Sequence, residues 1–329
     1  MIRYNALTGA ASVLALSAGM AHADPALMFD LGGKFDKSFN EAAYNGAERW
    51  RAETGGSYRE IEMQAAAQRV QFARRLAEAG SNPVVVMGFQ NAPTLEEVAP
   101  DYPDTSFVLI DAVVDLPNVR SIIFAEHEGS YLVGMLAAMA NETGTVSFVG
   151  GMEIPLITSF ACGYAQGAKA VNPDINVIVN YTGDTPAAWN DPVRGGEIAR
   201  AQISQGSDVV FAAAGGTGLG VLQAAEDSGV FSIGVDSNQN YLHPGSVLTS
   251  MLKLVDQAVY DAFTDGPGLE TGVVQMNLAA GGVGYALDEH NADLISDQMQ
   301  EAVEAAKAAI IAGELSVHDY RVDSVCPAF

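Results

Sequence analysis

The strongest constraint on the fold is a repeated alternation of short apolar runs with longer amphipathic segments, which begins at Asp24. The runs Val84–Met87, Ser106–Ile110 and Val209–Ala213 are apolar at nearly every position. Strands of this continuous apolar kind are buried on both faces, as they are in parallel sheets covered by helices. The pattern therefore predicts an α/β chain built on parallel sheets.

The alternation runs twice, with a break near residues 126–143, and 329 residues are enough for two domains. We therefore expect two doubly wound lobes, one comprising residues 24–125 with 246–272 and the other residues 126–245 with 273–329. The remaining predicted strands are Pro25–Phe29, Val119–Phe124, Thr145–Val149, Asn176–Tyr181, Phe231–Val235 and Val247–Met251. The predicted helices are Asn40–Thr54, Gln68–Ala79, Glu128–Met139, Phe160–Ala170, Pro192–Gln205, Leu219–Asp227, Leu254–Phe263 and Met299–Ala312.

The first 23 residues have the pattern of an export signal. Arg3 supplies a positive charge, residues 10–20 form a short apolar stretch, and Ala21-His22-Ala23 is a typical cleavage site. The apolar stretch is too short for a membrane-spanning helix. We expect a cleavable signal peptide and a periplasmic chain that starts at Asp24. No cysteine follows the cleavage site, so no lipid anchor is expected; the alternative is an N-terminal helix of the fold.

The charge balance excludes several classes of partner. Asp and Glu number 40 and Lys and Arg 16, which gives a net charge of −24. Such an acidic surface repels nucleic-acid polymers and anionic membranes. No G-x-S-x-G, H-E-x-x-H or phosphate-loop motif is present, and the five histidines are scattered. We therefore expect no catalytic activity, no metal and no cofactor. The spacing of Cys162 and Cys326 leaves open whether they form a disulfide.

Polar residues follow the predicted strands, where parallel sheets bind ligands. They are Asp30, Gly32-Gly33, Asp111, Gly150–Met152, Gly183-Asp184, Gly215–Gly218 and Asp236-Ser237. The glycine run from Gly215 suggests a dinucleotide site, but Val221 replaces the third glycine of that fingerprint. Whether or not this segment binds a dinucleotide, the Asp236 carboxylate can accept hydrogen bonds from two sugar hydroxyls.

Two aromatic residues lie in segments that would face a cleft. Phe39 follows a glycine turn at the start of a predicted helix, and Trp189 lies in a loop before Pro192. Opposed aromatic faces would hold a planar ligand between the lobes. The alternative is that both rings pack in the core. Ser38 and Glu41 also fit a capping box at the start of the helix, which is a purely structural role.

Six segments resemble the basic membrane protein (BMP) family of the purine nucleoside receptor type, which are substrate-binding proteins of ABC transporters. The segments are Phe29–Gly33 with Asp36–Asn40, Glu128–Gly134, Phe148–Met152, Phe160–Ala168, Val235–Gln239 and Thr249–Lys253. The resemblance covers essentially the whole mature chain. It implies a type I periplasmic-binding-protein fold, in which a three-segment hinge joins two Rossmann-like lobes and the ligand lies in the cleft.

The resemblance also implies roles for individual residues. Asp30 and Asn40 would bond the base or ribose, Phe39 and Trp189 would stack on a purine, and Asp111 would accept base N–H groups. Gly215 would let the ligand approach the backbone, while Asp236 and Lys253, paired with each other, would hold the ribose. Two departures from the family pattern are Phe35-Asp36, where an acidic pair is usual, and Trp189, where phenylalanine is usual.

The expected partners are a purine nucleoside (guanosine, adenosine or inosine) and a membrane permease, with the protein a monomer. Two alternatives stay open: a binding protein for another small polar ligand such as a sugar, and a nucleoside-processing enzyme.

Overall fold

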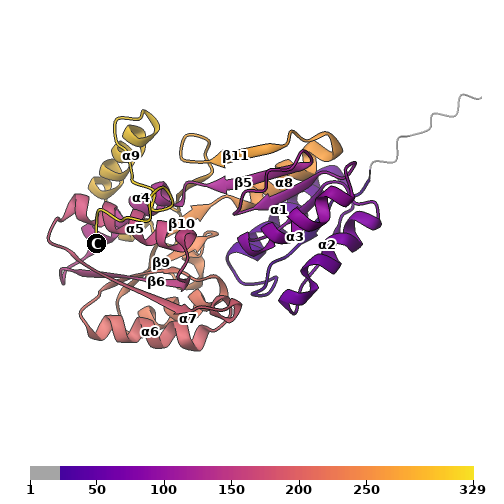
Figure 1. Cartoon of the computed structure of the whole chain (residues 1–329). Helices are drawn as coiled ribbons and strands as arrows, with labels where there is room; N and C mark the ends of the chain where they lie inside the picture. Colours follow the sequence, from indigo (N-terminus) through magenta and orange to yellow (C-terminus); the bar gives the residue numbers. More distant parts are fainter. Residues whose placement is uncertain (1–22) are drawn as a thin grey trace, which may run out of the picture.

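The computed structural model describes residues 23–329, so the predicted signal peptide lies outside the described residues except for Ala23. Two lobes, each built on one sheet, lie side by side (Figure 1). The first sheet is entirely parallel, with the strand order β11 (Gly272–Met276), β5 (Val119–Phe124), β4 (Phe107–Ile110), β3 (Val84–Val86), β1 (Ala26–Met28) and β2 (Arg59–Ile61).

Alternate residues of the first-lobe strands pack against different helices. Leu27 and Phe29 join the core beneath α1 (Phe39–Thr54) and α8 (Val255–Asp265). Ala26 and Met28 point the other way, toward α2 (Arg69–Glu78) and α3 (Ala92–Val98). Both faces of this sheet are therefore buried, as the continuous apolar runs predict.

The second sheet has the same construction, with one antiparallel edge. Its order is β12 (Val283–Tyr285), β10 (Val247–Lys253), β9 (Phe231–Asp236), β8 (Val209–Ala213), β6 (Thr145–Met152) and β7 (Asn176–Gly183), and only β12 runs antiparallel to its neighbour. Figure 1 shows its helices on both faces. The remaining α-helices are α4 (Glu126–Ala140), α5 (Pro155–Val171), α6 (Pro192–Ser204), α7 (Gly218–Asp227) and α9 (Asp297–Ile311).

The chain passes between the sheets three times, and the crossings lie close together. The first follows β5, the second follows β10, and the third follows β11. Ala125 N–H donates to Met276 O at 3.0 Å, which joins the first crossing to the third. Leu254 N–H donates to Gly282 O at 2.9 Å, which joins the second to the third.

The strand pairings divide the chain differently from the predicted boundaries at 246 and 273. β10 pairs with β9 and β12 of the second sheet, whereas β11 pairs with β5 of the first. We therefore propose that the first lobe comprises residues 24–125 with 254–276, and the second residues 126–253 with 277–329. The reason is that β10 is a buried central strand, whose apolar sequence suits either sheet.

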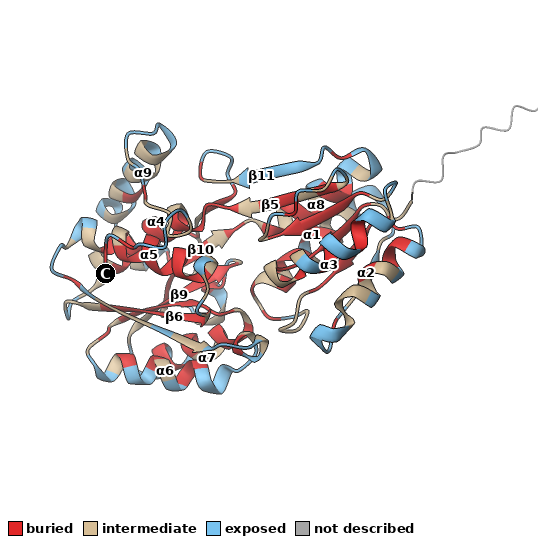
Figure 2. Cartoon of the chain, in the orientation of Figure 1, coloured by how far each residue is buried: buried red, intermediate tan, exposed pale blue. Residues whose placement is uncertain are grey.

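The eight predicted helices are all present, with ends displaced by at most five residues. Four elements, β2, α3, β11 and β12, had no counterpart in the prediction. Three of them are strands of three to five residues, and β11 and β2 are mostly exposed edges, as Figure 2 shows for β11. Such edges carry no continuous buried run that a sequence pattern could reveal.

Candidate ligand-binding site

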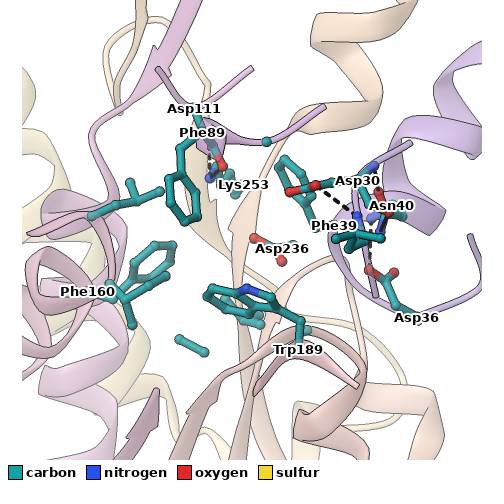
Figure 3. Close-up of a pocket in the computed structure, with 17 residues that line it drawn as sticks. Asp30, Asp36, Phe39, Asn40, Phe89, Asp111, Phe160, Trp189, Asp236 and Lys253 are labelled. Carbon is teal, nitrogen blue, oxygen red and sulfur yellow. Dashed lines mark hydrogen bonds and ion pairs between the residues drawn. The ribbon is translucent and has the colours of Figure 1, made fainter. Parts of the chain in front are cut away.

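A pocket lies between the lobes, with about 600 Å³ of empty space that is partly open to solvent. The eight residues to which the family resemblance gave ligand-binding roles all line it: Asp30, Phe39, Asn40, Asp111, Trp189, Gly215, Asp236 and Lys253. The other residues expected at this edge of the sheets do not line it: Gly32, Gly33, Gly150–Met152, Gly183, Asp184, Gly216–Gly218 and Ser237. Figure 3 shows Trp189 and Phe160 on one side of the open space and the first-lobe residues Asp30 and Asn40 on another. The structure thus brings together residues that are spread over more than 220 positions of sequence.

The strand ends place the charged side chains. Asp30 follows β1, Asp111 comes directly after β4, Asp236 ends β9, and Lys253 ends β10. Asp111 and Asp236 have φ angles of 76° and 63°, in the left-handed region that non-glycine residues rarely adopt. Each such conformation costs about 1–2 kcal/mol, and its presence at two pocket carboxylates is typical of a functional site.

Asp36 organises the turn that leads into α1. Its carboxylate accepts hydrogen bonds from the backbone N–H groups of Ser38 (2.9 Å), Asn40 (3.0 Å) and Glu41 (3.1 Å). The predicted capping box is therefore absent, because Asp36, and not the Ser38 side chain, caps the helix. Burial raises the pKa of Asp36 to about 7, although the three N–H donors oppose this shift.

The Ser38 side chain instead joins the two lobes. Its hydroxyl donates to Asp236 Oδ2 at 2.5 Å, and the Ser237 hydroxyl donates back to Ser38 O at 3.1 Å. Gln239 Nε2 also donates to Lys37 O at 2.9 Å. Burial raises the pKa of Asp236, while the nearby Lys253 ammonium and the Ser38 hydroxyl lower it. These contacts hold the lobes together beside the pocket.

Asn40 supports the pocket loop with both ends of its side-chain amide. Its Oδ1 accepts from Asp30 N–H at 3.0 Å, and its Nδ2 donates to Gly33 O at 3.2 Å. The Asp30 carboxylate accepts from Leu31 N–H and lies 3.5 Å from Arg69 Nη2. Burial raises the pKa of Asp30 to about 6, against the opposing effects of the Leu31 N–H and Arg69. Asn40 is therefore largely occupied in shaping the loop.

Lys253 is 2% exposed and pairs with Asp111, not with Asp236 as the sequence suggested. Its ammonium lies 2.7 Å from both carboxylate oxygens of Asp111 and 3.3 Å from Glu126 Oε1. Burial lowers the pKa of Lys253, but the carboxylates of Asp111, Glu126 and Asp236 raise it more, so it stays charged. The Asp236 carboxylate instead accepts its hydrogen bond from the Ser38 hydroxyl.

Aromatic rings from several elements line the remaining walls. The Trp189 ring lies against Gly151, where an added Cβ would come within 2.1 Å of the ring, so a side chain there would displace the tryptophan. The Lys253 ammonium lies 5.2 Å from the Phe39 ring centre and 5.7 Å from that of Phe160. Figure 3 shows Phe89 and Phe160 at the same side of the pocket.

Sequence reasoning missed nine lining residues, among them the carboxylate of Asp36 and the rings of Phe89 and Phe160. Phe89 comes three residues after β3, so the rule that ligands bind beyond strand ends would have found it. Asp36 belongs to a segment that the resemblance included, where Phe35-Asp36 takes the place of the usual acidic pair. Phe160 lies within α5, and no local pattern separates it from an ordinary core residue.

The pocket offers hydrogen-bond acceptors, one cation and flat apolar walls. Asp30, Asp111 and Asp236 can accept from N–H and O–H groups, and the aromatic rings suit a planar group. Between residues 23 and 329, no group of three or more His, Cys, Asp or Glu side chains is arranged to hold a metal ion. No helix in the same range is both long and apolar enough to cross a membrane.

Comparison with known proteins matches the chain to one family. The family model described as "ABC transporter substrate-binding protein PnrA-like" matches residues 24–321. The ABC transporter nucleoside-binding protein BmpA of Lactococcus lactis is 33% identical over 317 residues, which cover 89% of this chain and 88% of that protein. Basic membrane protein A of Borreliella afzelii is 29% identical over 318 residues, covering 91% and 93%.

Solved structures agree with these sequence matches. A crystal structure of an ABC transporter solute-binding protein from Aeropyrum pernix has a TM-score of 0.82 and 29% identity, and the match covers 92% of this chain and 95% of that one. This similarity, with the two sheets described above, confirms the predicted two-lobe type I periplasmic-binding-protein fold.

Proposed function

This chain belongs to the PnrA-like family of ABC transporter substrate-binding proteins, and we propose that the ligand it delivers to its permease is a purine nucleoside. The relative whose name states nucleoside binding is similar over most of both chains. To the nucleoside binding that this name states, the proposal adds that the base is a purine. It also adds that the base and the ribose bind in the interlobe pocket.

The observation that carries the proposal is the combination of flat apolar walls with buried acceptors in one pocket. Trp189, Phe39 and Phe89 present rings to it, while Asp30, Asp111 and Asp236 present carboxylates. A purine nucleoside has a planar base with N–H groups and a ribose with vicinal hydroxyls. Hydrogen bonds to charged groups contribute about 1.5–3 kcal/mol each, so several such bonds give useful affinity.

The excess of carboxylates also favours nucleosides over nucleotides. Four aspartates line the pocket, Asp30, Asp36, Asp111 and Asp236, against the single lysine Lys253. A phosphate group would face this negative charge, whereas a neutral nucleoside would not. We therefore expect guanosine, adenosine or inosine to bind and the corresponding 5′-monophosphates to bind far more weakly.

Isothermal titration calorimetry with the mature chain tests the proposal. Guanosine, adenosine, inosine and uridine are titrated, with ribose and guanosine 5′-monophosphate as comparisons. At least one purine nucleoside should bind with a Kd below about 100 µM, near the weak limit for a useful receptor. Binding of ribose without any nucleoside would instead support the sugar alternative. Release of free base on incubation with inosine would support the enzyme alternative.

The proposal includes the location of the protein. Residues 1–23 would be removed on export to the periplasm, leaving a chain without a lipid anchor that works as a monomer. One relative, 34% identical over 279 residues, is named a lipoprotein of Pyrococcus horikoshii, so the absence of an anchor is a point that the experiment must test. N-terminal sequencing of the exported chain should give Asp24 as the first residue.

A further inference from the structure

A chain of buried charges extends outward from the pocket behind Lys253. Glu126, at the first crossing between the lobes, is 0% exposed, and its two oxygens have different cationic partners. Lys253 Nζ lies 3.3 Å from Oε1, and Arg321 Nη1 lies 2.9 Å from Oε2. Neither Glu126 nor Arg321 lines the pocket.

Arg321 belongs to a C-terminal arm, residues 317–329, which is fastened to the second lobe. A disulfide joins Cys326 of the arm to Cys162 of α5. The Gln166 side chain forms two hydrogen bonds of 2.9 Å with the backbone of His318. Arg321 Nη2 also donates to Phe124 O, at the end of β5, at 2.9 Å. The arm therefore holds a guanidinium in place at the crossing.

We infer that Glu126 and Arg321 are positioning residues for the ligand site, which hold the Lys253 ammonium on Asp111 from outside the pocket. This inference rests on the proposed function in assigning Asp111 and Lys253 to the ligand. Lys253 faces two carboxylates, those of Asp111 and Glu126, within 3.3 Å. Because Arg321 neutralises Glu126, Lys253 can remain 2.7 Å from both oxygens of Asp111.

Loss of Arg321 would change how the Lys253 ammonium is shared between the carboxylates of Asp111 and Glu126. A buried carboxylate that loses one of its cations is costly, so Glu126 would draw Lys253 away from Asp111 or take up a proton. Besides Lys253 and Arg321, the charges around Glu126 are Asp111 beyond β4 and, through Arg321, Asp319 of the arm. Burial raises the pKa of Glu126, and the two cations oppose that shift.

Five variants of the full mature chain test the inference by calorimetry with guanosine at pH 7. Arg321→Ala should raise the Kd about tenfold or more, and Arg321→Lys should restore most of the affinity. Arg321→Ala combined with Glu126→Gln should bind better than Arg321→Ala alone, because no unpaired buried charge remains. Glu126→Gln alone measures how much the Glu126 carboxylate contributes to the affinity for guanosine.

Arg120→Ala is the matched control. Arg120 also combines an ion pair (Asp265, 2.6 Å) with a bond to a backbone carbonyl (Glu270, 2.6 Å), but it does not line the pocket. It should lower the unfolding midpoint and leave the Kd unchanged. An unchanged Kd in folded Arg321→Ala, or a double variant that binds no better than it, overturns the inference. If Arg321→Ala does not fold, Arg321→Gln takes its place.

A ligand-free measurement separates this inference from the proposed function. The Lys253 ammonium of the wild type should give a protected ¹⁵Nζ NMR signal, assigned with Lys253→Arg. Arg321→Ala should shift or abolish that signal, and Arg120→Ala should not. If wild type binds no nucleoside yet the signal responds in this way, the proposed function fails and the positioning role stands. A signal that Arg321→Ala leaves in place refutes the positioning role.

Discussion

The Ser38 hydroxyl of the first lobe donates a buried hydrogen bond to the Asp236 carboxylate of the second. Asp236 is largely buried, lines the pocket and lies at the end of β9. The bond exists only while the lobes are in contact, because separating them would expose both groups to water. Closure of the two lobes and the hydrogen bonding of the Asp236 carboxylate are therefore linked through Ser38.

Replacing Ser38 by alanine should weaken ligand binding without unfolding either lobe. A hydrogen bond to a charged group contributes about 1.5–3 kcal/mol, so the Kd for the nucleoside should rise about tenfold or more. Calorimetry measures the change. Ser57→Ala is the control, since Ser57 donates to Asp24 within the first lobe at 2.8 Å, and it should bind as wild type does. Equal Kd values for the two variants would contradict the closing role of Ser38.

Trp189→Ala should lower nucleoside affinity about ten- to a hundredfold, because stacking on an aromatic ring contributes about 1–3 kcal/mol per base. Trp189→Phe should retain most of the affinity, since a phenyl ring also offers a π face. A sugar ligand would depend less on the ring. Calorimetry with the same nucleoside compares the three proteins, and wild-type affinity in Trp189→Ala would exclude stacking.

The chain has two tryptophans, Trp50 and Trp189, which makes binding visible by fluorescence. Trp50 packs against Phe263, with ring centres 5.3 Å apart, and does not line the pocket. Binding should therefore change the emission of Trp50→Phe as it changes that of wild type. Trp189→Phe should lose the response. A response that persists in Trp189→Phe would mean that the ligand binds elsewhere or acts on Trp50 indirectly.

Asp36 should make the protein less stable as the pH rises. Its pKa is raised by burial from 3.8 to about 7 in the folded chain, so the folded state holds the proton more tightly than the unfolded state. The free energy of unfolding of wild type minus that of Asp36→Asn should then fall between about pH 4 and pH 7 and level off above. Taking this difference cancels the opposite contribution of His127, whose pKa burial lowers to about 4.

Urea denaturation at several pH values measures the difference. Asp191→Asn is the control, because Asp191 caps α6 through Arg194 N–H at 3.0 Å but is exposed. It reports the cost of losing a helix cap alone. A difference between wild type and Asp36→Asn that rises with pH would show that the three N–H donors outweigh burial and lower the pKa of Asp36 in the folded chain.

Removing the disulfide should destabilise the protein and leave the pocket assembled. Replacing Cys162 and Cys326 by serine should lower the free energy of unfolding by about 2–4 kcal/mol, since the bond closes a long loop. The Gln166–His318 hydrogen bonds still hold the arm, so the Kd should change less than in Arg321→Ala. Urea unfolding with and without reductant measures this. Reductant should affect wild type only, and an equal effect on the double variant would contradict the assignment.

Three of the four pocket carboxylates were predictable from the sequence, because a parallel sheet puts all its strand ends at one edge. Asp30, Asp111 and Asp236 each follow an apolar run, so the period of the fold alone places them in the cleft. The aromatic residue Trp189 was found through its loop and the family resemblance. These predictions depend on local pattern and on one general rule.

The partners of these residues were not predictable in the same way. Lys253 pairs with Asp111, and Glu126 with Arg321, across 142 and 195 positions of sequence, and no local pattern indicates such pairs. Ser38 fits a capping box locally, but tertiary contact gives its hydroxyl to Asp236 and the cap to Asp36. Long-range pairing decides which of several locally acceptable roles a polar residue takes.

The place of β11 in the first sheet has a consequence for how the protein is made. β11 (Gly272–Met276) pairs along its whole length with β5, which lies about 150 residues earlier in the sequence. Until residue 276 has left the ribosome, that edge of the first sheet has no partner and α8 has only just emerged. The first lobe therefore finishes folding after most of the second lobe has been synthesised, and a chain cut short before β11 would contain every pocket-lining residue but lack the edge strand of its first lobe.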